Sequence, residues 1–591
     1  MPDFDVVVLG GGTAGVLIAT GLAQAGRSVA LVEAGLVGGE SPYLACVPSK
    51  SLLASARRGE TWEHAVARRN GVTGHLDDNL IAARLAETGV RLIRGTGQVT
   101  KPGMVEVTAA GGRPGRGQAG NTAEAESTVL SYGDLVIATG SEPLAPPVEG
   151  LSDVPTWTSA EALSSPDLPR HLIVMGAGPA GCELAQIYAA FGSQVTLIEA
   201  EPQVLPDEAP FTGEILSDAL RRAGADLRLG SPVVKAAPLE KGLALVLADG
   251  TSLEGDRILL ATGRRPRLGG LCLDKLGIVP PASGALMVDA TCRVVTADGQ
   301  PAGTAAPLMS AAGPAGEGAA AAGPAAGGAA AAVVPEQPIA APAAAPPQTG
   351  AVPAPVSEQP APAPAAAAGQ PPPAPAAAPG QPPPAPAAAP GQTGPAPAAP
   401  SGRPSAGPAA AAAPGQASAA LPAAAAGRVW GAGDVTGIAP HTHTARYQAS
   451  VVVANILGER RAADYRAIPR CVFTTPSVYC VGVTPGHAAT AGIQLHTVGL
   501  DLADTARAAV EDDDRGRIEL YADTTRGDML VGAAAVGPHA EEWMGELTLA
   551  IRAGLSLRML ADVVHAFPTY GEAIERSLRE LATGVSLGDQ R

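Results

Sequence analysis

The sequence has few of the features that mark nucleic-acid-binding, membrane or metal proteins. It carries 40 Lys and Arg against 56 Asp and Glu, a net charge of −16, which argues against binding to nucleic acid or to an anionic membrane. No run of about 18 apolar residues is free of helix breakers, so no transmembrane segment is expected. The chain enters a strand directly after Met1 without a basic leader, which predicts a cytoplasmic protein. These absences favour small-molecule chemistry.

Cysteine is also scarce. The chain of 591 residues contains six cysteines, and their spacing fits neither a C-x-x-C pair nor a Cys/His metal motif, so no metal site is expected. Most of them read as reduced, packed thiols. The exception is Cys46, which stands in the stretch GGESPYLACVPSK (residues 38–50).

Between residues 301 and 427 the chain lacks the residue types that build a core. The segment is nearly all Ala, Pro, Gly and Gln, and GQPPPAPAAAP occurs from Gly369 and again from Gly380. Chains of this composition stay extended or fluctuate. We therefore predict a long disordered Ala/Pro-rich insertion at 301–427. It is either a surface loop without a role in the chemistry or a docking arm.

The first ordered block opens with a pattern typical of dinucleotide binding. An apolar strand leads into Gly10, Gly12 and Gly15, a helical stretch follows, and a second apolar strand ends in Glu33. The first glycine permits a tight turn, the second lets the backbone approach a pyrophosphate, and the third permits close packing of helix and strand. The acid binds a ribose hydroxyl. The pattern predicts a Rossmann-like domain.

The same pattern returns at Gly176, Gly178 and Gly181, with its acid at Glu199. Two dinucleotides are therefore implied. A carboxylate at this strand end binds a ribose 2′-hydroxyl and repels a 2′-phosphate, and no arginine follows until Arg221. NADH is thus favoured over NADPH.

Shorter stretches accompany the two patterns. DLVIATGSEP, which contains Thr139 and Gly140, and DRILLATGRRP, which contains Gly263, each predict a strand and a turn beside a nucleotide. After the insertion, RVWGAGDVTG supplies a short strand. Its Asp434 either accepts a hydrogen bond from a flavin ribityl hydroxyl or is a simple turn residue.

Together these motifs resemble those of the class I pyridine nucleotide-disulfide oxidoreductases, the family of dihydrolipoamide dehydrogenase, glutathione reductase and mercuric reductase. The stretches ACVPSK, GAGD, IPRCVFTTPSVYCVGVT (468–484) and HAFPTYGEA (565–573) add to the resemblance, which covers nearly everything outside the insertion. It implies an α/β protein with two Rossmann-like domains, one for FAD and one for NAD, and an α+β C-terminal domain that forms a homodimer.

The resemblance also implies domain boundaries. The FAD-binding domain would take residues 1–160 and, as its second segment, 285–300 and 428–465. The NAD-binding domain would take 161–284, and the dimerisation domain 466–591.

The catalytic motifs depart from the family. Cys46 matches the flavin-side cysteine of the family's redox disulfide, but Ser41 stands in place of the substrate-side cysteine. In the C-terminal signature H-A-H-P-T-x-x-E, Phe567 replaces the second histidine, so Glu572 has lost the partner it would orient. Phenylalanine has no titratable proton, so general acid-base catalysis is absent at this position. His565 is kept, but the family does not use the first histidine as its base.

These departures remove the thiol half of the family's reaction, whereas both nucleotide patterns are complete. We therefore expect an FAD-dependent enzyme that takes hydride from NADH and reduces a small non-disulfide acceptor such as a quinone. Phe567 would offer an aromatic wall to a planar ring, or would be ordinary packing. Alternatives are a disulfide reductase working through Cys46 alone, a pyridine nucleotide transhydrogenase and a non-catalytic flavoprotein scaffold.

Further residues complete the candidate site. Cys46 precedes Pro48, which we interpret as a helix start, where the helix dipole favours a thiolate. Such a thiolate would tune the flavin or cycle through a sulfenic acid as in a peroxidase, or Cys46 would be inert packing. Lys50 and Glu183 match family residues that pair beside flavin and nicotinamide, or they form a buried ion pair with a structural role alone.

The expected catalytic residues are Cys46, Lys50, Glu183 and Glu572. The expected FAD contacts are Gly10, Gly12, Gly15, Glu33, Lys50, Thr139, Gly140 and Asp434, and the expected NAD contacts are Gly176, Gly178, Gly181, Glu199 and Gly263. His441 and His443 follow Asp434, either as donors to the flavin or the acceptor or as ordinary helix-start histidines.

Overall fold

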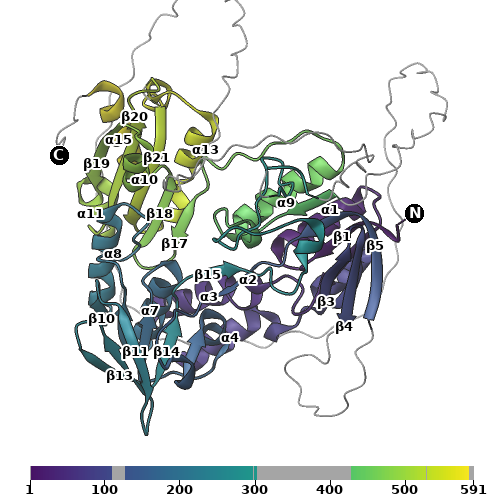
Figure 1. Ribbon diagram of the computed structural model, residues 1–591. Helices are drawn as coiled ribbons and strands as arrows, with labels where there is room; N and C mark the ends of the chain where they lie inside the picture. Colours follow the sequence, from purple (N-terminus) through teal and green to yellow (C-terminus); the bar gives the residue numbers. More distant parts are fainter. Residues whose placement is uncertain (1, 110–126, 297–298, 303–427, 528, 585–591) are drawn as a thin grey trace, which may run out of the picture. The chain divides into compact units, whose positions relative to one another are not determined.

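The structure is a computed structural model that describes residues 2–109, 127–296, 299–302, 428–527 and 529–584 (Figure 1). These residues belong to one compact unit of the chain. Apart from Pro301 and Ala302, the predicted insertion at 301–427 lies outside the described residues.

The first sheet carries the N-terminal glycine pattern. Its parallel strands follow one another in space as β3 (Arg91–Lys101), β2 (Val29–Glu33), β1 (Phe4–Leu9), β5 (Ser127–Ile137) and β16 (Arg428–Gly431). Strand β4 (Met104–Ala109) pairs antiparallel with the second half of β3 and the first half of β5. Because β16 follows the insertion, two segments far apart in the sequence complete this sheet.

Strand β1 is buried on both faces, as is typical of parallel sheets. Val6 and Val8 pack with the helices α1 (Thr13–Gln24) and α9 (Thr442–Ile456), which lie side by side in Figure 1. Val7 and Leu9 join the core on the opposite face. Four helices then connect β2 to β3: α2 (Glu40–Tyr43), α3 (Cys46–Arg57), α4 (Trp62–Val72) and α5 (Asn79–Glu87).

The second sheet carries the second glycine pattern. Its parallel strands run in the order β10 (Ala225–Arg228), β9 (Gln194–Ile198), β8 (His171–Met175), β14 (Arg257–Leu260) and β7 (Thr156–Thr158). Helices α6 (Ser159–Ser164), α7 (Pro179–Ala190) and α8 (Pro210–Arg222) accompany it, with an antiparallel sheet of β11 (Val233–Pro238), β12 (Leu243–Leu247) and β13 (Ser252–Gly255). Since β7 pairs with β14, this sheet begins a few residues before the predicted boundary at 161.

A short antiparallel pair, β6 (Ser141–Pro143) with β15 (Arg264–Pro266), joins the two turns that follow β5 and β14. The two A-T-G stretches of the sequence therefore end on one small sheet. This pair places the residues after each turn next to each other.

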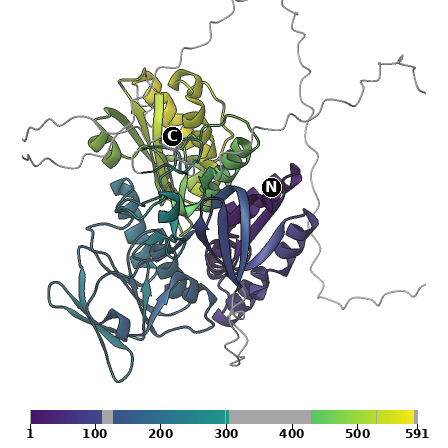
Figure 2. The same cartoon turned by 45° about the vertical axis from the view of Figure 1, so that its right-hand side comes forward.

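The C-terminal sheet is antiparallel, in the order β17 (Arg470–Val472), β18 (Ser477–Gly482), β21 (Met529–Gly537), β20 (Arg517–Asp523) and β19 (Leu495–Asp501). Helices α13 (Gly545–Ala553) and α15 (Gly571–Thr583) share a core with it. Shorter helices are α10 (Pro485–Ala491), α11 (Ala506–Glu511), α12 (Ala540–Trp543) and α14 (Leu557–Leu560). Figure 2 shows this sheet and its helices, green to yellow, from a second side. The predicted fold of two Rossmann-like domains and an α+β domain is confirmed.

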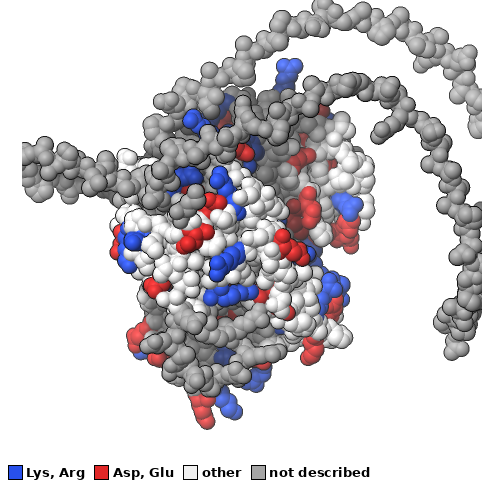
Figure 3. Space-filling view, turned by 90° about the vertical axis from the view of Figure 1, so that its right-hand side faces the viewer, with Lys and Arg blue, Asp and Glu red and all other residues white. Residues whose placement is uncertain are grey.

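The surface seen in Figure 3 carries basic and acidic side chains interspersed with one another. Within the described ranges, no helix is both long and apolar enough to cross a membrane. The same residues contain no group of three or more His, Cys, Asp or Glu arranged to hold a metal ion.

Candidate flavin and nicotinamide site

The first glycine turn has the geometry that close approach to a dinucleotide requires. Gly10 has a φ of +101°, and a Cβ there would lie 2.3 Å from the carbonyl oxygen of Ala138. A Cβ on Gly15 would lie 1.8 Å from the carbonyl oxygen of Gly10, so only glycine lets α1 pack this closely. A Cβ on Gly12 would meet nothing within 4 Å, and α1 starts there without a side-chain cap. The open helix start fits a pyrophosphate, because its first N–H groups have no partner inside the helix.

The second glycine turn repeats this geometry. Gly176 has a φ of +100°, and a Cβ on Gly181 would lie 1.9 Å from the carbonyl oxygen of Gly176. Gly178 begins α7 without a side-chain cap, and a Cβ there would again meet nothing within 4 Å. The residues present therefore fit two dinucleotides.

The acid that follows each pattern is held against its own glycine turn. Glu33 Oε2 accepts a hydrogen bond from the backbone N–H of Gly11 at 2.6 Å. Glu199 Oε2 accepts the equivalent bond from Ala177 at 2.6 Å. Each carboxylate thus stands beside its helix start, where the predicted ribose contact would be made.

The first A-T-G turn, after β5, is hydrogen-bonded to Arg267, which follows β15. Thr139 Oγ1 donates to the carbonyl oxygen of Arg267 at 2.6 Å, and the carbonyl oxygen of Gly140 accepts from the N–H of Arg267 at 2.9 Å. Gly140 and Gly263 have φ values of +74° and +109°, and a Cβ on either would meet nothing within 4 Å. Both turns therefore leave open space next to the glycine patterns.

Asp434 belongs to a network that the sequence analysis missed. Its Oδ2 accepts from Ser141 Oγ at 2.6 Å, and Ser141 Oγ accepts from Arg264 Nε at 2.7 Å. Arg264 Nη2 also forms an ion pair with Glu40 at 2.6 Å. The signal in the sequence is Glu40, an acid directly before Ser41. Arg264 thereby links β15, which follows the last strand of the second sheet in the sequence, to the segment that carries Ser41.

Lys50 and Glu183, which the sequence analysis expected to pair, lie in contact. Lys50 Nζ lies 3.0 and 2.9 Å from the two carboxylate oxygens of Glu183. Glu183 is only 5% exposed and also accepts from the N–H of Phe473 at 3.0 Å. The ammonium lies 4.4 Å from the centroid of the Phe473 ring. The pair joins α3 to α7 and both to the segment after β17.

Cys46 is the first residue of α3. The helix therefore begins two residues before Pro48, the position that the sequence predicts as its start. Cys46 Sγ lies 3.5 Å from Thr442 Oγ1, and Thr442 Oγ1 donates to Ser41 Oγ at 3.1 Å. All six cysteines of the chain are free. A hydroxyl chain therefore takes the place of the family's disulfide.

His441 and His443 form a stacked pair at the start of α9, with ring centroids 5.0 Å apart and planes at 16°. The carbonyl oxygen of Pro469 lies 2.8 Å from His443 Nε2, so this nitrogen carries a hydrogen. Burial is the main cause that lowers the pKa of both imidazoles, that of His441 to about 4. Both rings are therefore neutral near pH 7.

In the C-terminal signature, Phe567 takes the place of a histidine, and its neighbours in the motif have other partners. Phe567 is 75% exposed. The side chain of His565 is only 7% exposed, and its Nε2 lies 2.8 Å from Glu546 Oε1. Glu572 Oε2 accepts from the N–H of Ala506 at 3.0 Å and so stabilises the start of α11. His565 and Glu572 thus have partners within the C-terminal domain, and the catalytic role of Glu572 stays a prediction.

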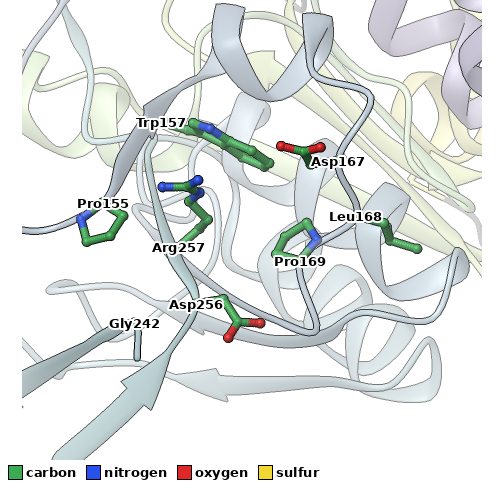
Figure 4. A pocket seen from close by; sticks show the side chains of 8 residues that line it. All are labelled: Pro155, Trp157, Asp167, Leu168, Pro169, Gly242, Asp256 and Arg257. Atoms are coloured by element: carbon green, nitrogen blue, oxygen red, sulfur yellow. The ribbon is translucent and has the colours of Figure 1, made fainter. Parts of the chain in front are cut away.

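A pocket of about 360 Å³ lies at the amino ends of the strands of the second sheet, by the start of β14 (Figure 4). Trp157, Asp167, Asp256 and Arg257 are among its lining residues, and the Arg257 guanidinium lies 5.5 Å from the centroid of the Trp157 ring. The glycine turn stands at the opposite, carboxyl ends of these parallel strands. This pocket is therefore separate from the candidate site.

Comparison with known proteins agrees with this geometry. The family model described as pyridine nucleotide-disulphide oxidoreductase matches residues 4–299, and the model of its dimerisation domain matches 468–578. The chain belongs to this family. Its members are FAD-dependent oxidoreductases that use NAD(P)H.

Similar proteins cover nearly the whole chain. A dihydrolipoyl dehydrogenase of Chlamydia muridarum is 24% identical over 577 residues, 96% of this chain and 95% of that protein. A mercuric reductase of Streptomyces lividans is 24% identical over 608 residues, 99% of this chain and 97% of that protein. Among solved structures, the HOCl-induced flavoprotein disulfide reductase RclA from Escherichia coli has a TM-score of 0.66 at 22% identity, covering 98% of this chain and 99% of that one.

Proposed function

We propose that this protein is an FAD-dependent NADH oxidoreductase that reduces a small non-disulfide acceptor such as a quinone. The observation that carries the proposal is the hydroxyl chain of Ser41 and Thr442 beside Cys46. A single thiol among hydroxyls cannot form the disulfide through which a dithiol enzyme passes electrons. When bound, FAD supplies the chemistry that accepts a hydride and passes electrons on.

Several side chains would bind and orient the two nucleotides. The open starts of α1 and α7 would hold the pyrophosphates, and Glu33 and Glu199 the ribose hydroxyls. The Lys50 ammonium, fixed by Glu183, would place a positive charge beside the reacting rings. Asp434, held by Ser141, would accept from the ribityl chain.

The preference for NADH rests on the surroundings of Glu199. Its carboxylate accepts bonds from two backbone N–H groups, those of Ala177 and Glu201, and forms no ion pair with an arginine among the described residues. A 2′-phosphate at this position would meet a negative charge, so NADPH should bind more weakly.

We also propose that the protein works as a homodimer through its C-terminal domain. The dimerisation-domain model matches residues 468–578. This domain exposes the apolar side chains Val564, 91% accessible, and Phe567, 75% accessible. Apolar side chains exposed to this degree favour burial against a second copy.

A screen of acceptors tests the proposal. Purified protein would be reduced by NADH without oxygen and then mixed with quinones, lipoamide, glutathione disulfide, peroxide or oxygen. We expect rapid reoxidation by quinones and negligible turnover with the disulfides. A flavin band that NADH does not bleach would indicate a scaffold, and hydride exchange between two nicotinamide pools a transhydrogenase.

The variant Cys46→Ser separates direct electron transfer from thiol chemistry. If electrons pass directly to the acceptor, the variant should keep most quinone turnover and change mainly the flavin spectrum. Loss of turnover with every acceptor, while NADH still reduces the flavin, would show that Cys46 is the working nucleophile.

A further inference from the structure

The hydroxyl chain has a defined hydrogen-bond direction. Thr442 has one hydroxyl hydrogen, and the geometry directs it to Ser41 Oγ. The 3.5 Å contact between Cys46 and Thr442 must then use the S–H of Cys46 as donor. Among the described residues Ser41 Oγ makes no other hydrogen bond, so its own hydrogen remains available to a bound molecule.

We propose that Cys46, Thr442 and Ser41 form a proton relay to the electron acceptor. This inference rests on the proposed function. Reduction of a quinone to a hydroquinone adds one hydride, which comes from NADH by way of the flavin, and one proton. In the relay, Ser41 gives its proton to the acceptor oxygen, Thr442 reprotonates Ser41, and Cys46 reprotonates Thr442.

The atoms and charges of this sequence balance. Each O–H or S–H bond that breaks is matched by one that forms, and the protein undergoes no redox change. The negative charge ends on Cys46 Sγ, at the first position of the 12-residue helix α3, where the helix dipole stabilises a thiolate. Cys46 is partly exposed, so a solvent proton restores the thiol. The sum is NADH, one proton and quinone to NAD⁺ and hydroquinone.

The fold places the donor end of the relay at the dinucleotide turn. The N–H of Gly38 donates to the carbonyl oxygen of Gly11 at 2.7 Å. A Cβ on Gly39 would lie 2.8 Å from the Cα of Gly12, so only glycine permits this contact. These contacts hold Gly38 and Gly39, which directly precede the segment that carries Ser41, against the turn that would bind FAD.

Two other residues, His443 next to Thr442 in the chain and Phe567 in the C-terminal signature, are less suited to supply this proton. The Nε2–H of His443 is directed to the carbonyl oxygen of Pro469. Phe567, at the place of the family's base, has no proton to give. Ser41, partly exposed and the end of a donor chain, is the group suited to the task.

The variant Thr442→Val interrupts the relay with almost no change in side-chain shape. Its matched control is Thr444→Val, two residues along α9, because Thr444 is 1% exposed and its Oγ1 has no hydrogen-bond partner among the described residues. Each variant would be oxidised by a benzoquinone, which needs a proton, and by ferricyanide, which takes electrons alone. Flavin content and the rate of reduction by NADH show whether the site is intact.

We expect Thr442→Val to slow quinone reduction by about 100-fold, the low end for loss of a positioned proton donor. Ferricyanide reduction and reduction by NADH should stay within about twofold of wild type, since neither uses the relay. The solvent deuterium isotope effect on quinone reduction should change in this variant and not in Thr444→Val.

Variants at the two ends test the order of the chain. Ser41→Ala should reproduce the loss in Thr442→Val, and the double variant should be no slower than either alone, because a chain is broken only once. Cys46→Ala should slow quinone reduction, and Cys46→Ser, which keeps a donor that is a weaker acid, should slow it less than Cys46→Ala does.

Equal slowing of quinone and ferricyanide by Thr442→Val would overturn the relay, because it would indicate a displaced flavin. Unchanged quinone reduction in Thr442→Val, with wild type active, would overturn the relay alone. A wild-type protein that NADH reduces but that no quinone reoxidises would overturn the proposed function and the relay with it.

Discussion

The ion pair of Lys50 and Glu183 allows a quantitative prediction. Glu183 is 5% exposed and accepts two bonds from Lys50 and one from the N–H of Phe473. The variant Lys50→Met keeps the unbranched side chain up to the position of Cε and removes its charge. A buried carboxylate is then left with a single donor.

The expected cost follows from burial. Removing one partner of a fully buried pair costs about 3–5 kcal/mol. The Lys50 side chain is 34% exposed, which weakens the pair, so we expect Lys50→Met to destabilise the protein by about 2–3 kcal/mol. Glu183→Gln still accepts from Phe473 and leaves an ammonium that can turn to water, so its cost should be about 1 kcal/mol. The double variant should be more stable than the sum predicts, with a coupling of about 1–2 kcal/mol.

The measurement is urea unfolding at saturating FAD, followed by circular dichroism and by the release of flavin fluorescence. Both signals are needed because a protein of several domains need not unfold in one step. Lys235→Met provides a control, since Lys235 pairs with Glu149 on the surface at 2.7 Å with side chains 51% and 71% exposed. Additive effects of Lys50→Met and Glu183→Gln would refute the reasoning, because the two groups would then contribute independently.

Further predictions concern cofactor, acid stability, thiols and the insertion. The protein should bind one FAD per chain, and Glu199→Ser should narrow its preference for NADH over NADPH in kcat/KM, since a negative charge is removed. As pH falls from about 6.5 to 4, the unfolded chain takes up a proton on His441 before the folded one, so stability should fall by about 2–3 kcal/mol, and His441→Asn should flatten this dependence. Ser41→Cys should give little lipoamide turnover, and adding Phe567→His should raise it beyond the product of the separate effects; a double variant whose turnover equals that product would contradict this. Deleting about residues 305–425 should leave flavin content and NADH oxidation nearly unchanged, whereas loss of FAD would show that the segment supports the fold.

The glycine turns could be predicted because their cause is local. Gly10 needs a positive φ, and Gly15 has a backbone oxygen where its Cβ would be. The requirement for glycine at these positions arises within a few residues, so it can be predicted from the sequence alone. The absence of a thiol at Ser41 and of an imidazole at Phe567 is legible in the same way, because each replacement changes what one side chain can do.

Hydrogen-bond and ion-pair partners that come from distant segments of the chain could not be predicted from the sequence. Thr442 joins Ser41 to Cys46 from about 400 positions away, and only the packing of α9 against the first sheet brings it there. Arg264 also reaches Glu40 across the fold, from the strand β15 that pairs with β6.

The C-terminal domain shows the contrast most plainly. The sequence alone identifies Glu572 by its place in the C-terminal signature and shows that Phe567 replaces the histidine of that motif. The tertiary structure decided which partner the carboxylate has in this chain, because the fold brings the N–H of Ala506, at the start of another helix, within 3.0 Å of it. A motif specifies which groups a side chain offers, whereas its partner depends on long-range packing that no local pattern encodes.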